Sequence, residues 1–389
     1  MMKKLHKLNS TPIILVLSFI VLLMTGEYIK THFNYNNIFT KLETNNSKIT
    51  KNNSDLKDFS MGELPTNAKN ANIENIKVYP GGFPVGIKMN TKGVLVVGFS
   101  DIEVAQDKIE SPGKKSGMEL GDVILKVNNE DILDSKDLIK KVDKSKQNVE
   151  ITIQRGDKIF NKTINPVVST LDNSKKMGLW VRDSTAGVGT MTFYYEKNNI
   201  YGALGHPITD ADTNSILKVR SGELVDSSII AVKKGEKGSP GELKGIFIDN
   251  EKSKGTILNN TFAGIYGKLN GENKFAFRNG QLSILPRDKV KEGKAQILTT
   301  IDEKGPTLYD VEIVKLFHQD APDIKSMVIK VTDERLLNKT GGIVQGMSGS
   351  PIIQDNCIVG AVTHVLVNRS DVGYGIYIEW MLNEAETVK

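Results

Sequence analysis

The segment Gln345–Ile353 holds the residues of this sequence best suited to covalent chemistry. It reads Gln-Gly-Met-Ser-Gly-Ser-Pro-Ile-Ile, so that Ser348 lies between two glycines. Glycines permit the tight backbone conformation that turns several N–H groups into one pocket. We therefore predict that Ser348 is a nucleophile and that the amides of Gly346 and Ser348 form an oxyanion hole. The structural alternative is a Gly/Ser-rich hairpin loop without chemistry.

A serine hydroxyl is a weak nucleophile and needs a neighbouring general base. We predict His206 as that base, because it directly follows the strand-like run Tyr201–Gly205 and precedes Ser348 in the chain. This order, and the β-run that follows Pro351, resemble chymotrypsin-like serine peptidases rather than the strand-to-helix elbow of α/β-hydrolases. The other histidines fit less well, and we interpret His364 as structural because it follows the nucleophile; the remaining ones are His6, His32 and His318.

A third group must orient the imidazole of the base. Asp333 follows the strand-like run Met327–Val331 and precedes Ser348, which makes it a candidate. Asp249 and Asp210 are competitors, and the spacing alone does not decide among the three.

The N-terminus predicts an extracytoplasmic protein. Lysines at positions 3, 4 and 7 precede a charge-free stretch, Leu8–Gly26, that is close to the length of a bilayer-crossing helix. We expect a cytoplasmic stub and transmembrane anchor in residues 1–30, with a cleaved signal peptide as the alternative. The Asn-, Lys- and Ser-rich residues 31–72 have too few apolar side chains to form a core, so we expect a flexible tether.

Residues 73–168 resemble a bacterial PDZ domain. The apolar strand Gly93–Gly98 precedes a Gly121-Asp122 turn into a second strand, Asp134 is placed to cap a helix, and Val149–Ile153 alternates as a half-buried strand. If the resemblance holds, the loop that receives the terminal carboxylate of a peptide ligand consists of Pro84, Val85, Gly86 and Ile87. The alternative is that these residues only cover a small core.

Residues 171–389 consist of short β-rich runs separated by glycines. This pattern is typical of a sandwich or barrel. The predicted fold class is therefore mainly β, with a transmembrane helix, a PDZ domain and a chymotrypsin-like double β-barrel peptidase domain.

The composition excludes several other classes of protein. Hydrophobic residues make up 39% and charged residues 25% of the chain, as in ordinary folded proteins. The net charge of +5 comes without a basic stripe, so we expect no nucleic-acid partner. Cys357 is the only cysteine and no HExxH motif occurs, so we expect neither a disulfide framework, nor a metal site, nor a cofactor.

The anchor, the PDZ-like region, the Leu204–Pro207 motif and the Gly346–Pro351 motif together resemble the stage IV sporulation protein B peptidases. The resemblance implies a catalytic triad of His206, Asp333 and Ser348. It also implies a peptidase secreted by the forespore into the space between the two forespore membranes. Such a peptidase would process its own N-terminal tether. It would then cleave a membrane-anchored regulator of an intramembrane protease and thereby trigger activation of a sigma factor.

Two other functions remain open at this point. The first is a non-catalytic extracytoplasmic PDZ adaptor with a degenerate peptidase fold, which a serine-directed label would fail to modify. The second is an acyl or ester hydrolase that uses the same serine and histidine. It is a weaker reading, because a PDZ module suits polypeptide substrates better.

Overall fold

The computed structural model describes residues 75–105, 107–248, 253–271, 277 and 280–388. The predicted anchor and tether, residues 1–30 and 31–72, lie outside these residues. Within the described part of the chain, no helix is both long and apolar enough to cross a bilayer.

Six antiparallel strands close into a first barrel. Each strand pairs with the next, and the last pairs again with the first. Buried aromatic and aliphatic side chains such as Tyr201, Leu224 and Ile257 fill its interior. In order around the ring, the strands are β2 (Pro84–Phe99), β11 (Leu179–Tyr195), β12 (Ile200–Ala203), β16 (Gly264–Leu269), β15 (Gly255–Thr261) and β13 (Val219–Lys233).

A second ring of six antiparallel strands follows in the C-terminal half of the chain. Its interior holds fully buried residues such as Ile329, Ile352 and Ile376. The two rings agree with the double β-barrel predicted for this region. In order, the strands are β22 (Cys357–Leu366), β21 (Pro351–Gln354), β18 (Gly293–Thr299), β19 (Thr307–Leu316), β20 (Met327–Val331) and β23 (Arg369–Tyr377).

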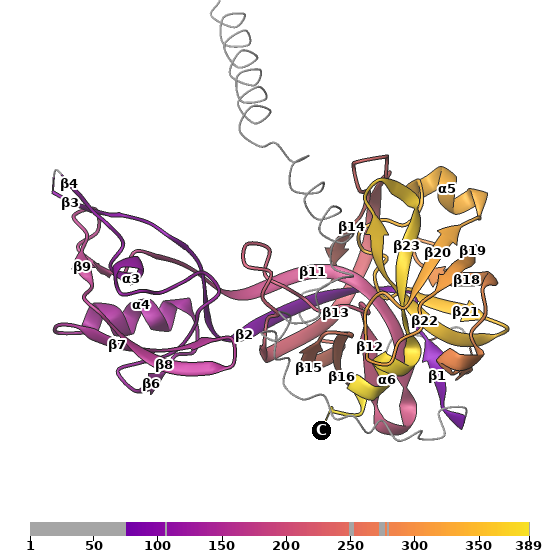
Figure 1. The fold of residues 1–389 in the computed structure, drawn as a ribbon, viewed down its shortest axis with the longest axis horizontal. Helices are drawn as coiled ribbons and strands as arrows, with labels where there is room; N and C mark the ends of the chain where they lie inside the picture. The colour runs from indigo at the N-terminus through magenta and orange to yellow at the C-terminus, as the bar shows by residue number, and fades with distance from the viewer. Residues whose placement is uncertain (1–74, 106, 249–252, 272–276, 278–279, 389) are drawn as a thin grey trace, which may run out of the picture. The chain divides into compact units, whose positions relative to one another are not determined.

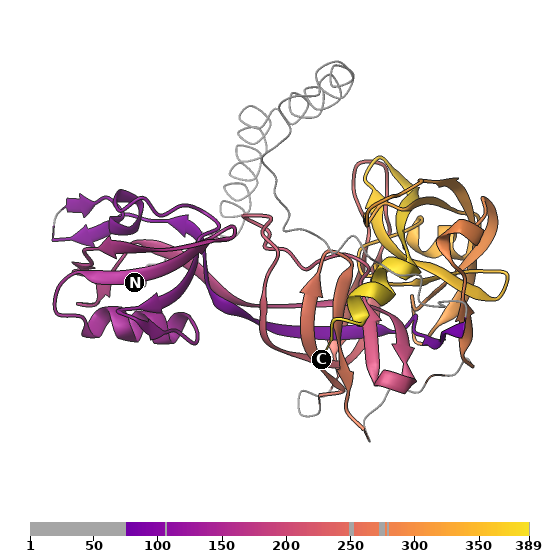
Figure 2. The same ribbon diagram turned by 60° about the horizontal axis from the view of Figure 1, so that its bottom comes forward.

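Short elements join and cover the barrels. Strand β1 (Lys77–Pro80) pairs with β11 and with β17 (Leu282–Ile284), and β14 (Glu242–Phe247) pairs with β13. Helix α5 (Glu334–Thr340) leads toward the predicted nucleophile. The last helix, α6 (Ile378–Ala385, yellow in Figure 2), packs on strands of both barrels, namely β12, β16, β22 and β23.

The PDZ region has its own small core. Helix α4 (Ser135–Lys144) begins at Asp134, whose carboxylate accepts a hydrogen bond from the Asp137 amide at 2.8 Å, as the capping prediction required. The helix buries Leu138 and Val142 and leaves Ile139 exposed. It packs with β5 (Val123–Val127), β7 (Val149–Arg155) and β8 (Lys158–Ile164). The other elements are β3 (Ile102–Val104), β4 (Asp107–Ile109), α3 (Pro112–Lys115), β6 (Glu130–Asp131), β9 (Val167–Val168) and β10 (Lys175–Lys176).

The PDZ region is inserted between two neighbouring strands of the first barrel, β2 and β11, which lie side by side (Figure 1). The first half of β2 belongs to the barrel, whereas its second half pairs with β5 of the PDZ region. A boundary at residue 73 would therefore assign β1 and part of a barrel strand to the PDZ domain. A long strand shared by two cores gives no break in the sequence pattern, so the pattern alone does not locate a boundary there.

The same strand corrects the predicted carboxylate loop. Residues Pro84–Ile87 are not a loop but the start of β2, paired on one side with β11 and on the other with β13. A Cβ atom on Gly86 would lie 2.6 Å from the side chains of Phe247 and Val225, so close packing explains this glycine. The prediction that these four residues bind a peptide carboxylate is wrong in this structure.

Candidate active site

A cavity of about 520 Å³ lies where residues of both barrels meet. Strand β11 contributes residues 185–189 to its wall, and the second barrel contributes β22 and the loop after α5. The cavity brings His206 together with Gly346 and Ser348, which lie 140 and 142 residues later in the sequence, and Ile87 of β2 also lines it.

The loop after β12 positions His206. Leu204 and Gly205 both adopt positive φ angles, 73° and 70°, which turn the chain sharply at the end of the strand. Nδ1 of His206 lies 2.8 Å from the Pro207 carbonyl oxygen. A proton on Nδ1 donated to that carbonyl leaves Nε2 as the basic nitrogen. Burial lowers the pKa of His206, against the opposing effect of the Pro207 contact, so the ring is neutral near pH 7.

The loop between α5 and β21 positions Ser348. Gly346 and Gly349 have φ angles of 95° and 98°, which residues other than glycine rarely adopt. Among the described residues, neither the Gly346 N–H nor the Ser348 N–H has a hydrogen-bond partner. The Ser348 hydroxyl donates to the Thr363 carbonyl at 2.7 Å and makes no hydrogen bond to His206. The loop therefore presents a hydroxyl and two unpaired amides at one cavity.

Thr190 of β11 connects the two loops, and no motif in the sequence indicated this role. Its hydroxyl donates to the Gly346 carbonyl at 2.7 Å, and its amide donates to the Ser348 carbonyl at 3.1 Å. Its own carbonyl accepts the Leu204 amide at 3.2 Å. A Cβ atom on Gly349 would lie 2.1 Å from the Thr190 carbonyl oxygen, so the nucleophile loop packs directly on this strand.

Comparison with known protein families identifies the chain. The SpoIVB peptidase S55 family matches residues 173–382, and a PDZ domain matches residues 82–165. The chain belongs to the SpoIVB peptidase S55 family, and it is a serine peptidase. No curated protein matches the chain.

Two solved structures of the Rv3671c protease from M. tuberculosis are also similar to this chain. The active form is 10% identical, with a TM-score of 0.32, and the similarity covers 52% of this chain and 74% of that one. The inactive form is 12% identical, with a TM-score of 0.30, and the similarity covers 52% of this chain and 84% of the other.

In this S55 peptidase, the predicted acid Asp333 is not at the cavity. Its carboxylate caps α5 by accepting the Arg335 amide at 2.9 Å, pairs with the Arg335 guanidinium at 2.7 Å, and accepts the Asp310 amide at 3.2 Å. The Arg335 hydrogen bond is the main cause that lowers the pKa of Asp333 to about 2. The expectation that Asp333 orients His206 is therefore not met in this structure.

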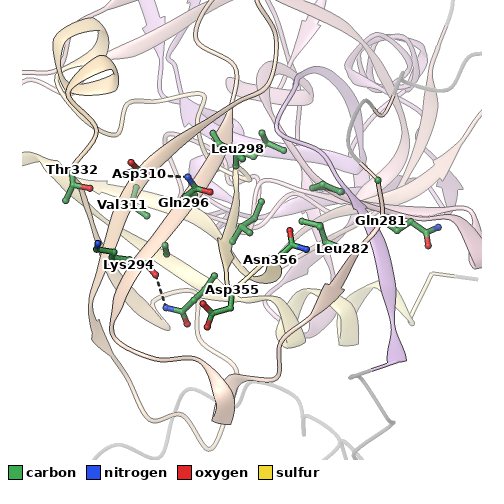
Figure 3. Close-up of a pocket in the computed structure, with 16 residues that line it drawn as sticks. Gln281, Leu282, Lys294, Gln296, Leu298, Asp310, Val311, Thr332, Asp355 and Asn356 are labelled. Atoms are coloured by element: carbon green, nitrogen blue, oxygen red, sulfur yellow. Dashed lines mark hydrogen bonds between the residues drawn. The ribbon is translucent and has the colours of Figure 1, made fainter.

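Residues next to Asp333 line a different cavity, of about 870 Å³ (Figure 3). Its neighbours Thr332 and Asp310 line that cavity, where Gln296 donates to Asp310 at 2.8 Å. None of the predicted site residues lines it.

The two other candidate acids do not replace Asp333. Asp210 is buried, but its carboxylate pairs with Arg182 and accepts the Thr213 amide, and it does not line the cavity. Asp249 lies outside the described residues. No Asp or Glu is among the described residues that line the cavity of His206 and Ser348. Across the described chain, moreover, no three His, Cys, Asp or Glu residues gather as metal ligands would.

The position of His364 in the structure differs from its predicted structural role. We expected a structural histidine with its hydrogen bonds satisfied, but the structure places its ring in the cavity, 5.0 Å from the ring of His206 between centroids. Its buried Nδ1 has no hydrogen-bond partner among the described residues. The available signal was its position directly after Thr363 on β22, the second strand after the nucleophile loop.

The PDZ region has a cavity of its own, of about 500 Å³. Leu138, Ile139 and Val142 of helix α4 line it, together with residues 174–179. Residues 179–182 of β11 pair with β2 on one side only among the described strands. The unpaired edge of this part of β11 and the apolar side chains of α4 therefore border the same cavity.

Proposed function

We propose that this S55 peptidase is a membrane-tethered serine endopeptidase of sporulation. The single observation that carries the catalytic part is the meeting of Ser348, His206 and two unpaired amides in one cavity. In this proposal it processes its own N-terminal region and cleaves a membrane-bound regulatory protein in the intermembrane space, and this cleavage triggers sigma factor activation. The charge-free stretch Leu8–Gly26 and the family membership support this placement.

The proposed mechanism uses groups of this chain alone. Nε2 of His206 takes the proton of the Ser348 hydroxyl while Oγ attacks the scissile carbonyl carbon. The Gly346 and Ser348 amides donate to the resulting oxyanion, and each such donor is worth about 2.7–4 kcal/mol in measured cases. His206 then gives its proton to the leaving amine. A water molecule, activated by the same imidazole, hydrolyses the acyl-enzyme and regenerates the hydroxyl.

One rearrangement must precede the attack. The Ser348 hydroxyl donates to the Thr363 carbonyl in this structure, so it must exchange that acceptor for His206. Catalytic hydrogen bonds are commonly loose before substrate binds and tighten in the complex. Substrate binding at the Thr363 carbonyl would release the hydroxyl toward the base.

The function is tested by incubating purified wild-type protein and the Ser348→Ala variant and mapping new N-termini by mass spectrometry. We expect wild type to generate new ends in residues 31–72, and the variant to generate none. A folded Ser348→Ala protein that still produces these ends would reject Ser348 as the nucleophile. New ends absent from both proteins, with an added peptide still hydrolysed by wild type, would reject self-processing alone.

We also propose that the PDZ domain binds the C-terminal end of a peptide between α4 and residues 174–181 rather than at Pro84–Ile87. The free edge of residues 179–182 can add a peptide strand, and Ile139 offers apolar surface beside it. Lys175 and Lys176 line the same cavity, although Lys176 already pairs with Asp172 at 2.8 Å.

Two exposed apolar residues of similar accessibility provide the test of this second site. Ile139 lines the cavity and is 59% exposed, whereas Leu133 is 60% exposed and lies outside it. Ile139→Glu should weaken binding of a peptide with an apolar C-terminus at least tenfold by calorimetry, and Leu133→Glu should leave it unchanged. Equal effects of the two substitutions would reject this location.

A further inference from the structure

A second cavity, of about 660 Å³, adjoins the catalytic one. Residues 186–188 of β11, together with Gln345 and Gly346, line both cavities. Ser348 and His206 line only the catalytic cavity. The two cavities are therefore continuous, and they meet at the loop whose Gly346 amide is proposed to bind the oxyanion.

The hairpin of β13 and β14 supplies the rest of the lining of this second cavity. The Leu243 amide of β14 donates to the Gln345 carbonyl at 2.8 Å, and the Gln345 amide donates to the Gly241 carbonyl at 2.9 Å. These two bonds fix the hairpin to the nucleophile loop. A Cβ atom on Gly245 would lie 2.9 Å from the side chain of Val188, so the missing side chain lets β14 pack closely on β11.

Ile230 is the residue of this hairpin that is out of register. Ile229 pairs with Gly245 and Ala231 pairs with Lys244, so Ile230 is an extra residue in β13 and forms a β-bulge. Ile229 is buried, whereas Ile230 is 61% exposed and lines the second cavity. Bulges beside active sites commonly re-aim a side chain. Here the bulge directs an apolar side chain to the cavity.

The lining of the second cavity favours an apolar ligand group. The two charged lining residues, Glu242 and Lys244, are both exposed and carry opposite charges. The Phe247 ring packs against β2, where a Cβ atom on Gly86 would lie 2.6 Å from it. The apolar side chains of the lining are those of Val188, Ile230, Leu243 and Phe247.

Strand β11 offers backbone groups along both cavities. Residues 184–189 pair with β2 on one side, and no described strand pairs with their other side, since the pairing of β11 with β12 begins at Met191. Ala186 and Gly187 are exposed. An extended peptide can hydrogen-bond to such an edge and become an additional strand.

The geometry of the acyl-enzyme decides which half of a substrate lies in the second cavity. The acyl carbon is bonded to Oγ of Ser348, which lies 2.7 Å from the Thr363 carbonyl oxygen of β22. Residues of β22 line the catalytic cavity but not the second one. The residues before the scissile bond therefore lie along β22. Those after the bond continue past Gly346 toward the second cavity.

We propose that the second cavity binds the part of a polypeptide substrate that follows the scissile bond, and that Ile230 is a specificity-determining residue there. The substrate adds as a strand to residues 186–188 of β11 and places an apolar side chain against Ile230 and Phe247. The inference rests on the proposed function, because it requires that Ser348 attacks a peptide bond. It adds the chemical class of the substrate residue that is selected after that bond.

The kinetic test takes a peptide that wild type hydrolyses and places leucine or asparagine at each of the first three positions after the cleaved bond. Wild type should prefer leucine at one of them by about tenfold in kcat/KM, as is usual for an apolar contact in a pocket. Ile230→Glu should lose this preference. Ile246→Glu should keep it, because Ile246 is 49% exposed on the same hairpin but does not line the cavity.

Rates are taken per active site titrated with a fluorophosphonate, so that partial unfolding of a variant is not read as altered selectivity. The same preference in wild type and Ile230→Glu would overturn the proposal, as would equal losses in Ile230→Glu and Ile246→Glu. A preference that changes only at positions before the cleaved bond would place the other half of the substrate in this cavity and would also overturn it.

Methyl nuclear magnetic resonance of full-length Ser348→Ala protein separates this proposal from the proposed function. The probe is the peptide Ala-Leu-Leu-Ala with a free N-terminus, which mimics the leaving half of a substrate, and Ala-Asn-Asn-Ala is the control. The first peptide should shift the methyl signals of Val188 and Ile230, the second should not, and Ile230→Glu should abolish the Val188 shift. Signals that do not move would overturn the proposal. Shifted signals in a chain whose wild type hydrolyses no peptide would reject the peptidase mechanism but keep the cavity as a peptide site.

Discussion

Two polar clusters of this peptidase are built in opposite ways. Around Asp333, each carboxylate oxygen has donors, supplied by the Arg335 side chain and by the Arg335 and Asp310 amides. Around Ser348 and His206, an imidazole nitrogen and two backbone amides have no partner among the described residues. A satisfied cluster stabilises a fold, whereas unpaired groups that converge on a cavity are available to a reacting molecule.

The difference separates groups that are available to a reacting molecule from groups that support the fold. Asp333 has the residue type and the chain order of a triad acid. In this structure, however, its carboxylate accepts hydrogen bonds from the start of α5 and from β19. His364 has the wrong chain order for a base, but its ring lies beside that of His206 in the same cavity. Substitutions around Ser348 and His206 should therefore affect catalysis, and substitutions at Asp333 should affect stability.

The largest expected effect is the loss of the base. His206→Ala should lower kcat by a factor approaching 10⁶, as for members of other serine–histidine units, because no carboxylate of the described residues lines the cavity to take the proton. Peptide hydrolysis per folded enzyme measures it. A loss below about tenfold would place the base elsewhere.

The next effect is at the oxyanion site. Gly346→Ala forces a side chain onto a residue with a φ of 95° and brings a Cβ to 3.0 Å from Leu243, so the amide should turn away. We expect kcat to fall about 10²–10³-fold. Gly280→Ala is the control, since a Cβ there meets nothing within 4 Å. Equal kcat in the two variants would show that the Gly346 amide does not bind the oxyanion.

Asp333→Ala should act on stability rather than on chemistry. Loss of the helix cap and of the Arg335 pair should lower the free energy of unfolding by about 1–3 kcal/mol. The kcat per titrated active site should stay within about threefold of wild type. A collapse of kcat in protein that is fully folded by circular dichroism would restore Asp333 as the triad acid and contradict the structural assignment made here.

The smallest effect is a pH dependence of the same cluster. The pKa of Asp333 is held at about 2 in the folded state, below its ordinary value, mainly by Arg335. Its contribution to stability is therefore complete above about pH 4, the unfolded value, and is lost as the pH falls toward 2. Denaturant unfolding of wild type and Asp333→Asn should show a stability difference that shrinks from pH 5 to pH 3. A constant difference would mean that the carboxylate charge does not matter.

The sequence predicted what local pattern and chain order can encode. The Gly346–Gly349 turn, the histidine after a strand, the Asp134 cap and the glycine-separated β-runs of the barrels all follow from short-range rules. The contacts of Thr190 and His364 could not be predicted, because they depend on which strands become neighbours when two rings close. The boundary between the barrel and the PDZ region cannot be located from the sequence for a similar reason, because one unbroken strand, β2, serves two cores.

The central claim is that Ser348 is a nucleophile activated by His206, and serine-directed fluorophosphonate labelling tests it most directly. The site of labelling is read by peptide mass spectrometry in wild type, His206→Ala and the control His318→Ala. The account predicts a single labelled serine, Ser348, in wild type and in the control, and almost no label after loss of His206. Label on another serine, or undiminished labelling of Ser348 in His206→Ala, would contradict it.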